Sequence, residues 1–317
     1  MAERVAGTMR AYGRQSIPGL ILITVLSCLA SEASRAVAAE PVPAAGINTK
    51  AARDEATKAI PWKSLDRNAQ AAVQDIITNT SIYRRLPPQT IDCEPDLFLN
   101  LLKNPELVVN MWTTLGVTKM SMDRFGPGNY RLSDGEGTTG NARVLAGNDD
   151  MHLILSDGSY TGGMYPRPIK GRCVLLLRHE FAQDQRGRIL ITCNLDMFLT
   201  IDNFGVEVLA KTFQSTVGKA TDHNFAETTS FVSKLSKTSE TNPDGIVRLT
   251  QKLQSVDPPV KEEFCILAVA VNEKLTLAKR AYLQRAAMTP TVNTAAPARQ
   301  QAAPRAIAPA SASGVRR

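Results

Sequence analysis

The sequence predicts an α+β fold in which an antiparallel meander sheet wraps on a long helix, with extra helices before and after. Two observations lead to this prediction. Residues 117–202 alternate apolar and polar side chains between recurring Gly- and Asp-rich turn clusters, a pattern typical of antiparallel strands. Residues 205–239 instead place apolar side chains at helical spacing.

The first 39 residues have the features of a cleavable signal peptide. Three arginines precede an apolar run over 17–30, and small residues follow at 36–39. The run is shorter than the roughly 20 residues that a membrane-spanning helix requires. We therefore expect export to the periplasm, the cell surface or the medium. An uncleaved anchor and a lipid anchor at Cys28 remain alternatives.

The rest of the chain divides by composition into a linker, one folded domain and a tail. Residues 40–60 are rich in Pro and Ala and then mixed in charge, which indicates a linker. Residues 61–287 form a single α+β domain, with a core at 89–240 and helical extensions at 61–86 and 246–287. The Ala/Pro/Arg-rich residues 288–317 are expected to be disordered.

The arginines of the leader and the tail account for most of the formal net charge of +7, so the domain itself is close to neutral. A high whole-chain pI would otherwise indicate a polyanionic partner. We therefore expect no nucleic-acid partner. The tail could still make contacts with the envelope or with other proteins, and the sequence leaves the oligomeric state open.

Helices are predicted around the meander from their start and stop signals. Ser64 is a suitable N-cap, and Pro87 and Pro88 end the helix that it begins. A short extended segment covers 89–93. The further helices are expected at 95–102, 105–115, 205–239, 246–253 and 260–287.

The last two strands of the meander have the clearest pattern. They cover 171–179 and 188–201, and placing Leu175 opposite Leu195 separates their side chains into two sets. One face is apolar and carries Cys173, Leu175, Leu177, Cys193, Leu195, Met197 and Leu199. The other face carries Leu176, Arg178, Asn194, Asp196 and Phe198.

Over about residues 89–240 the chain resembles the START-like helix-grip superfamily, which includes polyketide cyclases and lipid-binding proteins. The resemblance lies in the order of elements, in Asp96 to Leu99 as the first helix, and in Asn104-Pro105-Glu106 with Trp112 as the following junction. The helix from Gly205 matches the gripping helix. The superfamily has no diagnostic catalytic motif, so the resemblance transfers no catalytic residue.

The resemblance implies an apolar cavity between the sheet and the long helix. Its wall would be formed by Leu175, Leu177, Leu195, Met197 and Leu199 from the sheet and by Phe213 and Val217 from the helix. The alternative is that these side chains form a packed core, since protein interiors are close-packed by default. The family topology also pairs the first strand with the last, which makes a disulfide between Cys93 and Cys193 possible.

No motif in the sequence indicates catalysis, a metal or a cofactor. The three histidines, His152, His179 and His223, are far apart, and His179 is expected at a solvated strand end. Residues 135–140 are Gly-rich but lack the following Lys of a phosphate-binding loop. The cysteines have no metal-binding spacing.

These observations predict an exported, non-catalytic protein that binds an apolar or amphipathic ligand of the lipid or isoprenoid class. One alternative is a structural or interaction protein of the envelope without a small ligand. A second is an enzyme of cyclase or hydrolase type, which would need polar groups that converge in a cavity.

Overall fold

The computed structural model describes residues 45–162, 168–185, 187–202 and 214–288. The chain divides into two compact units, 1–276 and 277–317. The first unit holds the sheet and its helices, and the described part of the second is the end of one helix. The predicted signal peptide with Cys28, the start of the predicted linker, Phe213 and the predicted tail from 289 onward lie outside the described residues.

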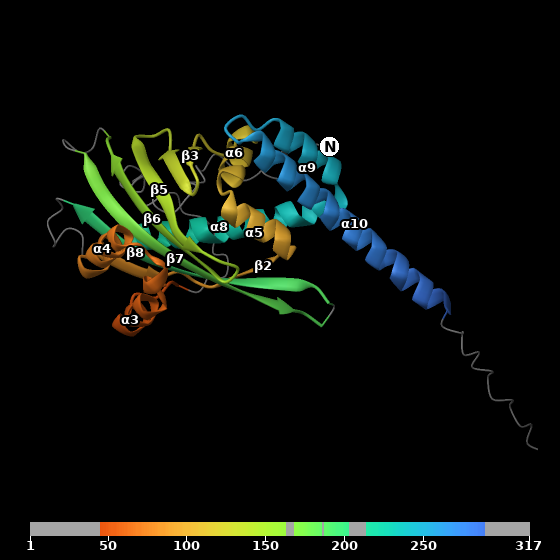
Figure 1. Cartoon of the computed structure of the whole chain (residues 1–317), viewed down its shortest axis with the longest axis horizontal. Helices are drawn as coiled ribbons and strands as arrows, with labels where there is room; N and C mark the ends of the chain where they lie inside the picture. Colours follow the sequence, from red (N-terminus) through yellow and green to blue (C-terminus); the bar gives the residue numbers. More distant parts are fainter. Residues whose placement is uncertain (1–44, 163–167, 186, 203–213, 289–317) are drawn as a thin grey trace, which may run out of the picture. The chain divides into compact units, whose positions relative to one another are not determined.

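The described strands form one eight-stranded antiparallel sheet (Figure 1). The strands follow the order β1-β8-β7-β6-β5-β4-β3, and β2 pairs with β8 beyond the end of β1. The sheet therefore contains a consecutive meander from β3 to β8, closed by the first strands at the β8 edge. The bounds are β1 (Ile82–Arg85), β2 (Gln89–Asp92), β3 (Ser121–Gly126), β4 (Asn129–Ser133), β5 (Thr138–Gly147), β6 (Met151–Tyr160), β7 (Ile169–Gln183) and β8 (Ile189–Asp202).

Helices precede, interrupt and follow the sheet, which confirms the predicted α+β class with a long helix after the meander. They are α3 (Lys50–Ala59), the short 3-10 helix η1 (Trp62–Ser64), α4 (Arg67–Thr78), α5 (Pro95–Lys103), α6 (Glu106–Thr114), α8 (Gln214–Thr241), α9 (Pro243–Gln251) and α10 (Pro258–Met288). Within the described residues, none of these helices combines the length and the apolarity needed to cross a membrane.

The predicted register of the last two strands is wrong by two residues. Leu175 lies opposite Met197, and Leu177 lies opposite Leu195. Since side chains in a strand alternate with a period of two, this shift moves no side chain to the other face. The two predicted faces are therefore correct even though their pairing is not.

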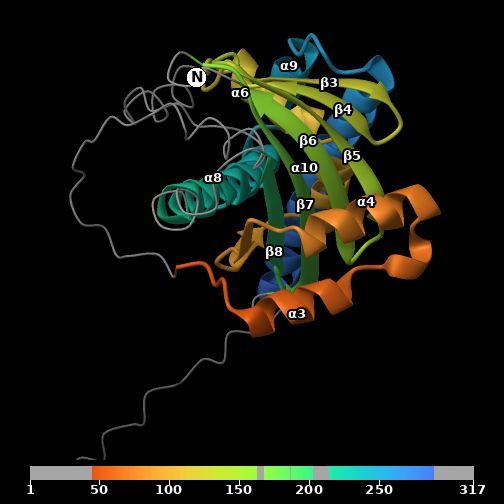
Figure 2. The same ribbon diagram turned by 90° about the vertical axis from the view of Figure 1, so that its left-hand side faces the viewer.

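Each face of the sheet packs against its own set of helices (Figure 2). The inner face, which carries Leu175 and Met197, contributes to a core shared with α5, α6, α8, α9 and α10. The outer face, which carries Leu176 and Phe198, packs against α3 and α4. The sheet is thus buried on both sides, which explains why Leu175 and Leu176 can be adjacent and both apolar.

The segment predicted as a linker, 40–60, contains helix α3. Thr49 caps its N-terminus, with its hydroxyl accepting from the Ala52 amide, and Ala52 and Ala56 pack on the outer face. Ahead of it, the Ile47 amide donates to the Arg85 carbonyl over 2.7 Å. The packing on the sheet and the bond to Arg85 are long-range, so the composition that indicated a linker could not reveal them.

The predicted helical extension 61–86 is shorter in the structure. Helix α4 ends at Thr78, and residues 82–85 form strand β1 instead. Ile82 and Tyr83 are buried and pair with Leu199 and Phe198 of β8. Pairing with a buried strand therefore outweighs the helical pattern of the preceding residues.

A row of glycines crosses the inner face. Gly140, Gly158 and Gly171 lie opposite one another on β5, β6 and β7. A Cβ atom at Gly140 would lie 2.4 Å from the carbonyl oxygen of Asp157, so the neighbouring backbone excludes a side chain there. The row leaves a strip of the inner face without side chains, a feature that marks a bend or a close approach in a sheet.

Candidate functional site

The candidate site is the inner face of the sheet, where the predicted cavity residues come together. Leu175, Leu195, Met197, Leu199 and Val217 all belong to one buried core, and Leu177 is partly buried against it. Val217 comes from α8, so the helix faces the predicted wall as expected. The arrangement matches both a packed core and the lining of a ligand site.

Helix α8 is fastened across the inner face at both ends of its described length. Near its C-terminal half, the Ser236 hydroxyl accepts from the Glu94 amide over 3.2 Å, and the Phe231 ring packs edge-on to Trp112 with centroids 5.5 Å apart. Near its N-terminal half, Asp222 accepts from the Arg84 Nε over 2.7 Å and forms a second contact with the same guanidinium. Side-chain contacts therefore hold α8 along the β1 and β2 edge of the sheet.

Besides the histidines described below, three buried polar side chains on this side of the sheet have no hydrogen-bond partner among the described residues. They are Asn100 on α5, Ser156 on β6 and Asn224 on α8, which are 3%, 1% and 2% exposed. Neither the amide nitrogen nor the amide oxygen of the two asparagines is bonded. Since nearly all buried polar groups in folded proteins are satisfied, three in one layer call for an explanation.

The positions of these groups follow from their elements. Ser156 lies opposite Cys173, so it belongs to the inner face, and it is two residues before Gly158 in the glycine row. Asn224 is two helical turns after Val217, which places it on the buried side of α8. No spacing pattern in the sequence marks them as binding groups, because a single Asn or Ser in an apolar stripe has no spacing signature.

A pair of histidines is buried at the other end of the inner face. The rings of His152 and His179 stack with centroids 5.9 Å apart, and Phe98 of α5 packs edge-on to His179 at 5.1 Å. Burial lowers the pKa of His152 to about 4, and burial likewise lowers the pKa of His179. The expectation of a solvated strand end at His179 is wrong, because α5 covers it. His223 is exposed on α8.

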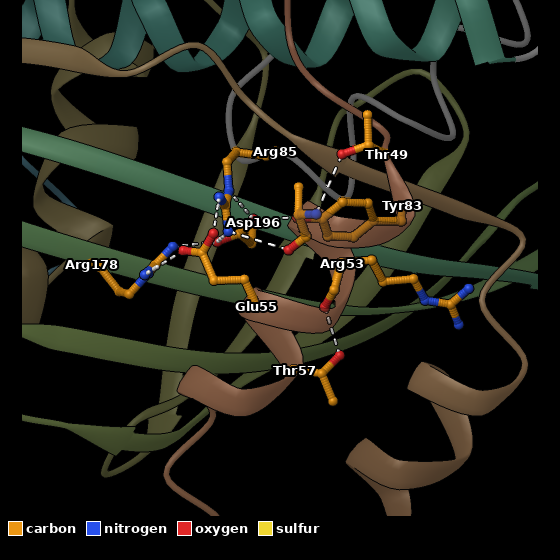
Figure 3. A network of polar contacts seen from close by, with 9 residues as sticks. Thr49, Arg53, Glu55, Thr57, Tyr83, Arg85, Arg178 and Asp196 are labelled. Atoms are coloured by element: carbon orange, nitrogen blue, oxygen red, sulfur yellow. Dashed lines mark hydrogen bonds and ion pairs between the residues drawn. The ribbon is translucent and has the colours of Figure 1, made fainter.

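The outer face holds a contrasting polar site, which Figure 3 shows from close by. Asp196 is fully buried and accepts from the Tyr83 hydroxyl at 2.7 Å, the Arg85 Nε at 2.8 Å and an Arg178 Nη2 at 2.9 Å. Glu55 of α3 pairs with Arg85 at 3.0 Å, and the contact with Arg85 lowers the pKa of Glu55. Two acids thus balance two arginines, and the network joins α3 to the sheet.

A surface pocket of about 370 Å³ opens beside this network. It is lined by Asn48, Lys50, Arg53, Thr80, Ser81 and Tyr83. Arg53 already donates to the Ile77 carbonyl over 2.5 Å, and the Tyr83 hydroxyl is committed to Asp196. None of the lining residues belongs to the inner-face core, and Arg53 and Tyr83 already bond within the protein.

The Asn104-Pro105-Glu106 junction from the sequence analysis anchors the edge of the sheet. Arg124 of β3 donates to Glu106 over 2.8 Å and to the Asn104 side chain over 2.7 Å. Burial raises the pKa of Glu106, and Arg124 opposes this shift. The junction therefore fixes α6 to β3 by an ion pair.

The described cysteines, Cys93, Cys173, Cys193 and Cys265, are free thiols in the structure, which does not contain the disulfide that the resemblance makes possible between Cys93 and Cys193. The pairing of the first strands with β8 is as expected. Cys193, however, lies opposite Gln89, and Asp92 lies opposite Leu190, so the register places Cys93 about four residues away from the position facing Cys193.

The described residues contain no group of three or more His, Cys, Asp or Glu side chains that could hold a metal ion.

Comparisons with known proteins give weak matches. No protein-family model matches the chain, and no curated protein matches it. Among solved structures, the hypothetical protein jhp0584 from Helicobacter pylori matches 63% of this chain and 99% of its own, at 9% identity and a TM-score of 0.32. An uncharacterised protein from Rhizobium leguminosarum matches 46% of this chain and 95% of its own, at 10% identity and a TM-score of 0.29. Scores this low transfer no property to this chain.

Proposed function

We propose that this chain is an exported, non-catalytic binding protein of START-like helix-grip type, whose inner face takes an apolar or amphipathic ligand of the lipid or isoprenoid class. One observation carries the proposal: unbonded polar side chains are buried on the side of the sheet that carries the apolar inner-face core. Small-molecule sites are mostly apolar, with a few convergent polar groups. A ligand with a polar head would bond these groups and bury its apolar part against the leucines.

The test is native mass spectrometry of the purified mature protein, followed by lipid extraction. A molecule that stays bound to the intact protein and is recovered in the organic phase is the expected result. A protein that carries no such molecule and takes up none from a mixed lipid extract would overturn the proposal.

A pair of matched variants locates the site. Leu195→Trp fills the inner face and should abolish ligand retention. Leu155→Trp adds the same volume on the outer face, where Leu155 is partly buried against the other core, and should leave retention unchanged. Equal effects of both variants would place the ligand elsewhere.

A second candidate function is that of an envelope structural or interaction protein, and exposed apolar side chains on α10 favour it. Ile266 and Leu277 are each 62% exposed. The variant Ile266→Lys should weaken self-association in sedimentation velocity, and so should deletion of 277–317. Deletion from residue 246 would be uninformative, because it removes Phe264, which is fully buried.

A further inference from the structure

The pocket of about 370 Å³ beside α3 has a positively charged lining. It lies where the start of α3 meets the segment between α4 and β1, and its lining includes Lys50 and Arg53 but no acidic residue. Within the described part of the chain, neither cation forms an ion pair. The two charges are therefore gathered in one cavity and have no partner there.

Most acids on the elements around the pocket are paired with other cations. Asp75 of α4 and Asp202 of β8 both contact Arg172, and the acids of the outer-face network and of α8 are held by the arginines described above. Asp54 of α3 and Asp66 of α4 are exposed and lie outside the lining. The pocket therefore keeps its positive charge.

The charge pattern of α3 is the reverse of the one that stabilises a helix by itself. Lys50 is its first residue, and its first turn contains no acid. Because the amino end of a helix carries a partial positive charge, acids are favoured there and cations are disfavoured. An anion in the pocket would offset this arrangement.

The lining also offers hydrogen-bond donors that the fold does not use. Arg53 gives one N–H to the Ile77 carbonyl over 2.5 Å, which leaves the other guanidinium hydrogens available, and the guanidinium points away from the outer-face network in Figure 3. The Ser81 hydroxyl accepts from the Ile201 amide over 3.2 Å and can still donate its own hydrogen. The exposed Asn48 side chain has no bond within the described residues. Such a set of donors suits an oxyanion.

From these observations we propose that the pocket is a second binding site, distinct from the inner face, which takes the phosphate group of a phosphate monoester. Lys50 and Arg53 supply the charge, and Asn48 and Ser81 donate to the remaining oxygens. Such a group carries nearly two negative charges at neutral pH and three strong acceptor oxygens, which matches two cations and neutral donors. The volume lies at the lower end of the range for small-molecule sites, so the pocket suits a soluble phosphate ester or the head group of a lipid, and not a whole lipid.

The experiment follows the backbone amide chemical shifts of the mature protein while inorganic phosphate is added at neutral pH. We expect saturable shifts at the residues of the lining, above all at Asn48, Lys50, Arg53 and Ser81. Chloride at the same ionic strength should give no saturable shift, because it screens charges without occupying the donor set.

Two charge reversals on α3 test the site. Lys50→Glu should weaken phosphate binding by at least about tenfold, because it replaces an attraction in the pocket by a repulsion. It should not lower the midpoint of urea unfolding, because an acid is favourable at the first position of a helix. Lys58→Glu is the matched control, since Lys58 is an exposed lysine in the last turn of the same helix and lies outside the lining. It changes the net charge equally and should leave phosphate binding unchanged.

Vesicles identify the source of the phosphate group. Cosedimentation compares phosphatidylcholine vesicles with vesicles that also contain phosphatidic acid, whose head group is a phosphate monoester. Binding to the second kind alone, lost in Lys50→Glu and kept in Lys58→Glu, identifies a lipid head group, whereas phosphate binding without vesicle binding identifies a soluble ester. The proposal is overturned if neither phosphate nor these vesicles bind, or if the two variants weaken binding equally, since binding would then depend on net charge alone. Neither result bears on the ligand proposed for the inner face.

Discussion

Buried polar groups are hydrogen-bonded on the outer face of the sheet, whereas several on the inner face are unbonded. On the outer face, the buried Asp196 has Tyr83, Arg85 and Arg178 as partners, and Glu55 completes the charge balance. On the inner face, Asn100 and Asn224 are as deeply buried and have no partner among the described residues.

The difference agrees with the proposed function, in which the outer face contributes stability and the inner face binds the ligand. A satisfied network rigidifies the place where it lies, and α3 is fastened there. Unbonded buried amides reduce stability, so they are retained where they serve another purpose. The comparison therefore supports the proposal that the inner face binds a ligand.

The largest expected effect comes from breaking the outer network. Asp196→Ala should lower the free energy of unfolding by about 4 kcal/mol, because it leaves two arginines in a buried site without their shared carboxylate. Urea denaturation measures it. Glu55→Gln is the control at the exposed end of the network, and its effect should be much smaller because solvent screens an exposed ion pair. If both variants lower the free energy of unfolding equally, the buried carboxylate of Asp196 stabilises the protein no more than the exposed carboxylate of Glu55.

Substitution of two neighbouring leucines compares the packing of the two faces directly. Leu176→Ala on the outer face should cost about 4 kcal/mol, and Leu175→Ala on the inner face about 2 kcal/mol, since a side chain that borders a ligand space loses fewer contacts. Both are buried, at 0% and 4% exposure. Denaturant unfolding of delipidated protein gives both values, and equal costs would indicate that the inner face is a packed core.

Low pH should lower the stability of the folded protein through the buried histidines of the inner face. The pKa of His152 is about 4 in the folded protein against about 6.5 in the unfolded chain, so the unfolded chain binds more protons between these values. Stability should therefore fall as the pH falls from 6.5 to 4. His152→Phe keeps the ring and removes the titration, and should reduce this loss by on the order of 2 kcal/mol. Parallel pH profiles for the wild type and the variant would contradict the assignment.

The smallest effect concerns the attachment of α8. Asp222→Asn should cost about 1 kcal/mol, because the ion pair with Arg84 is only partly buried, and it should speed amide exchange in the first turns of α8. Glu240→Gln removes an exposed pair with Lys237 at the other end of the helix and should change neither. Unchanged exchange in Asp222→Asn would show that packing alone holds α8.

The sequence was sufficient for the fold class and for the separation of the two faces, because both depend on local periodicity. Leu175 and Leu176 were assigned to opposite faces from alternation alone, and this assignment survives the two-residue error in register. The boundary of α4 and the identity of α3 were missed, because Ile82, Tyr83 and Ala56 are held by contacts with strands far away in the sequence.

Local patterns in the sequence establish the α+β class, the long helix after the meander and the apolar character of the inner face. Only the tertiary structure decided that α3 and α4 cover the outer face, that Asp196 meets Arg85 across 111 residues of sequence, and that Asn100 and Asn224 are buried without partners. The physical reason is that alternation is a property of neighbouring residues. Whether a buried polar group is satisfied depends instead on which distant element packs against it.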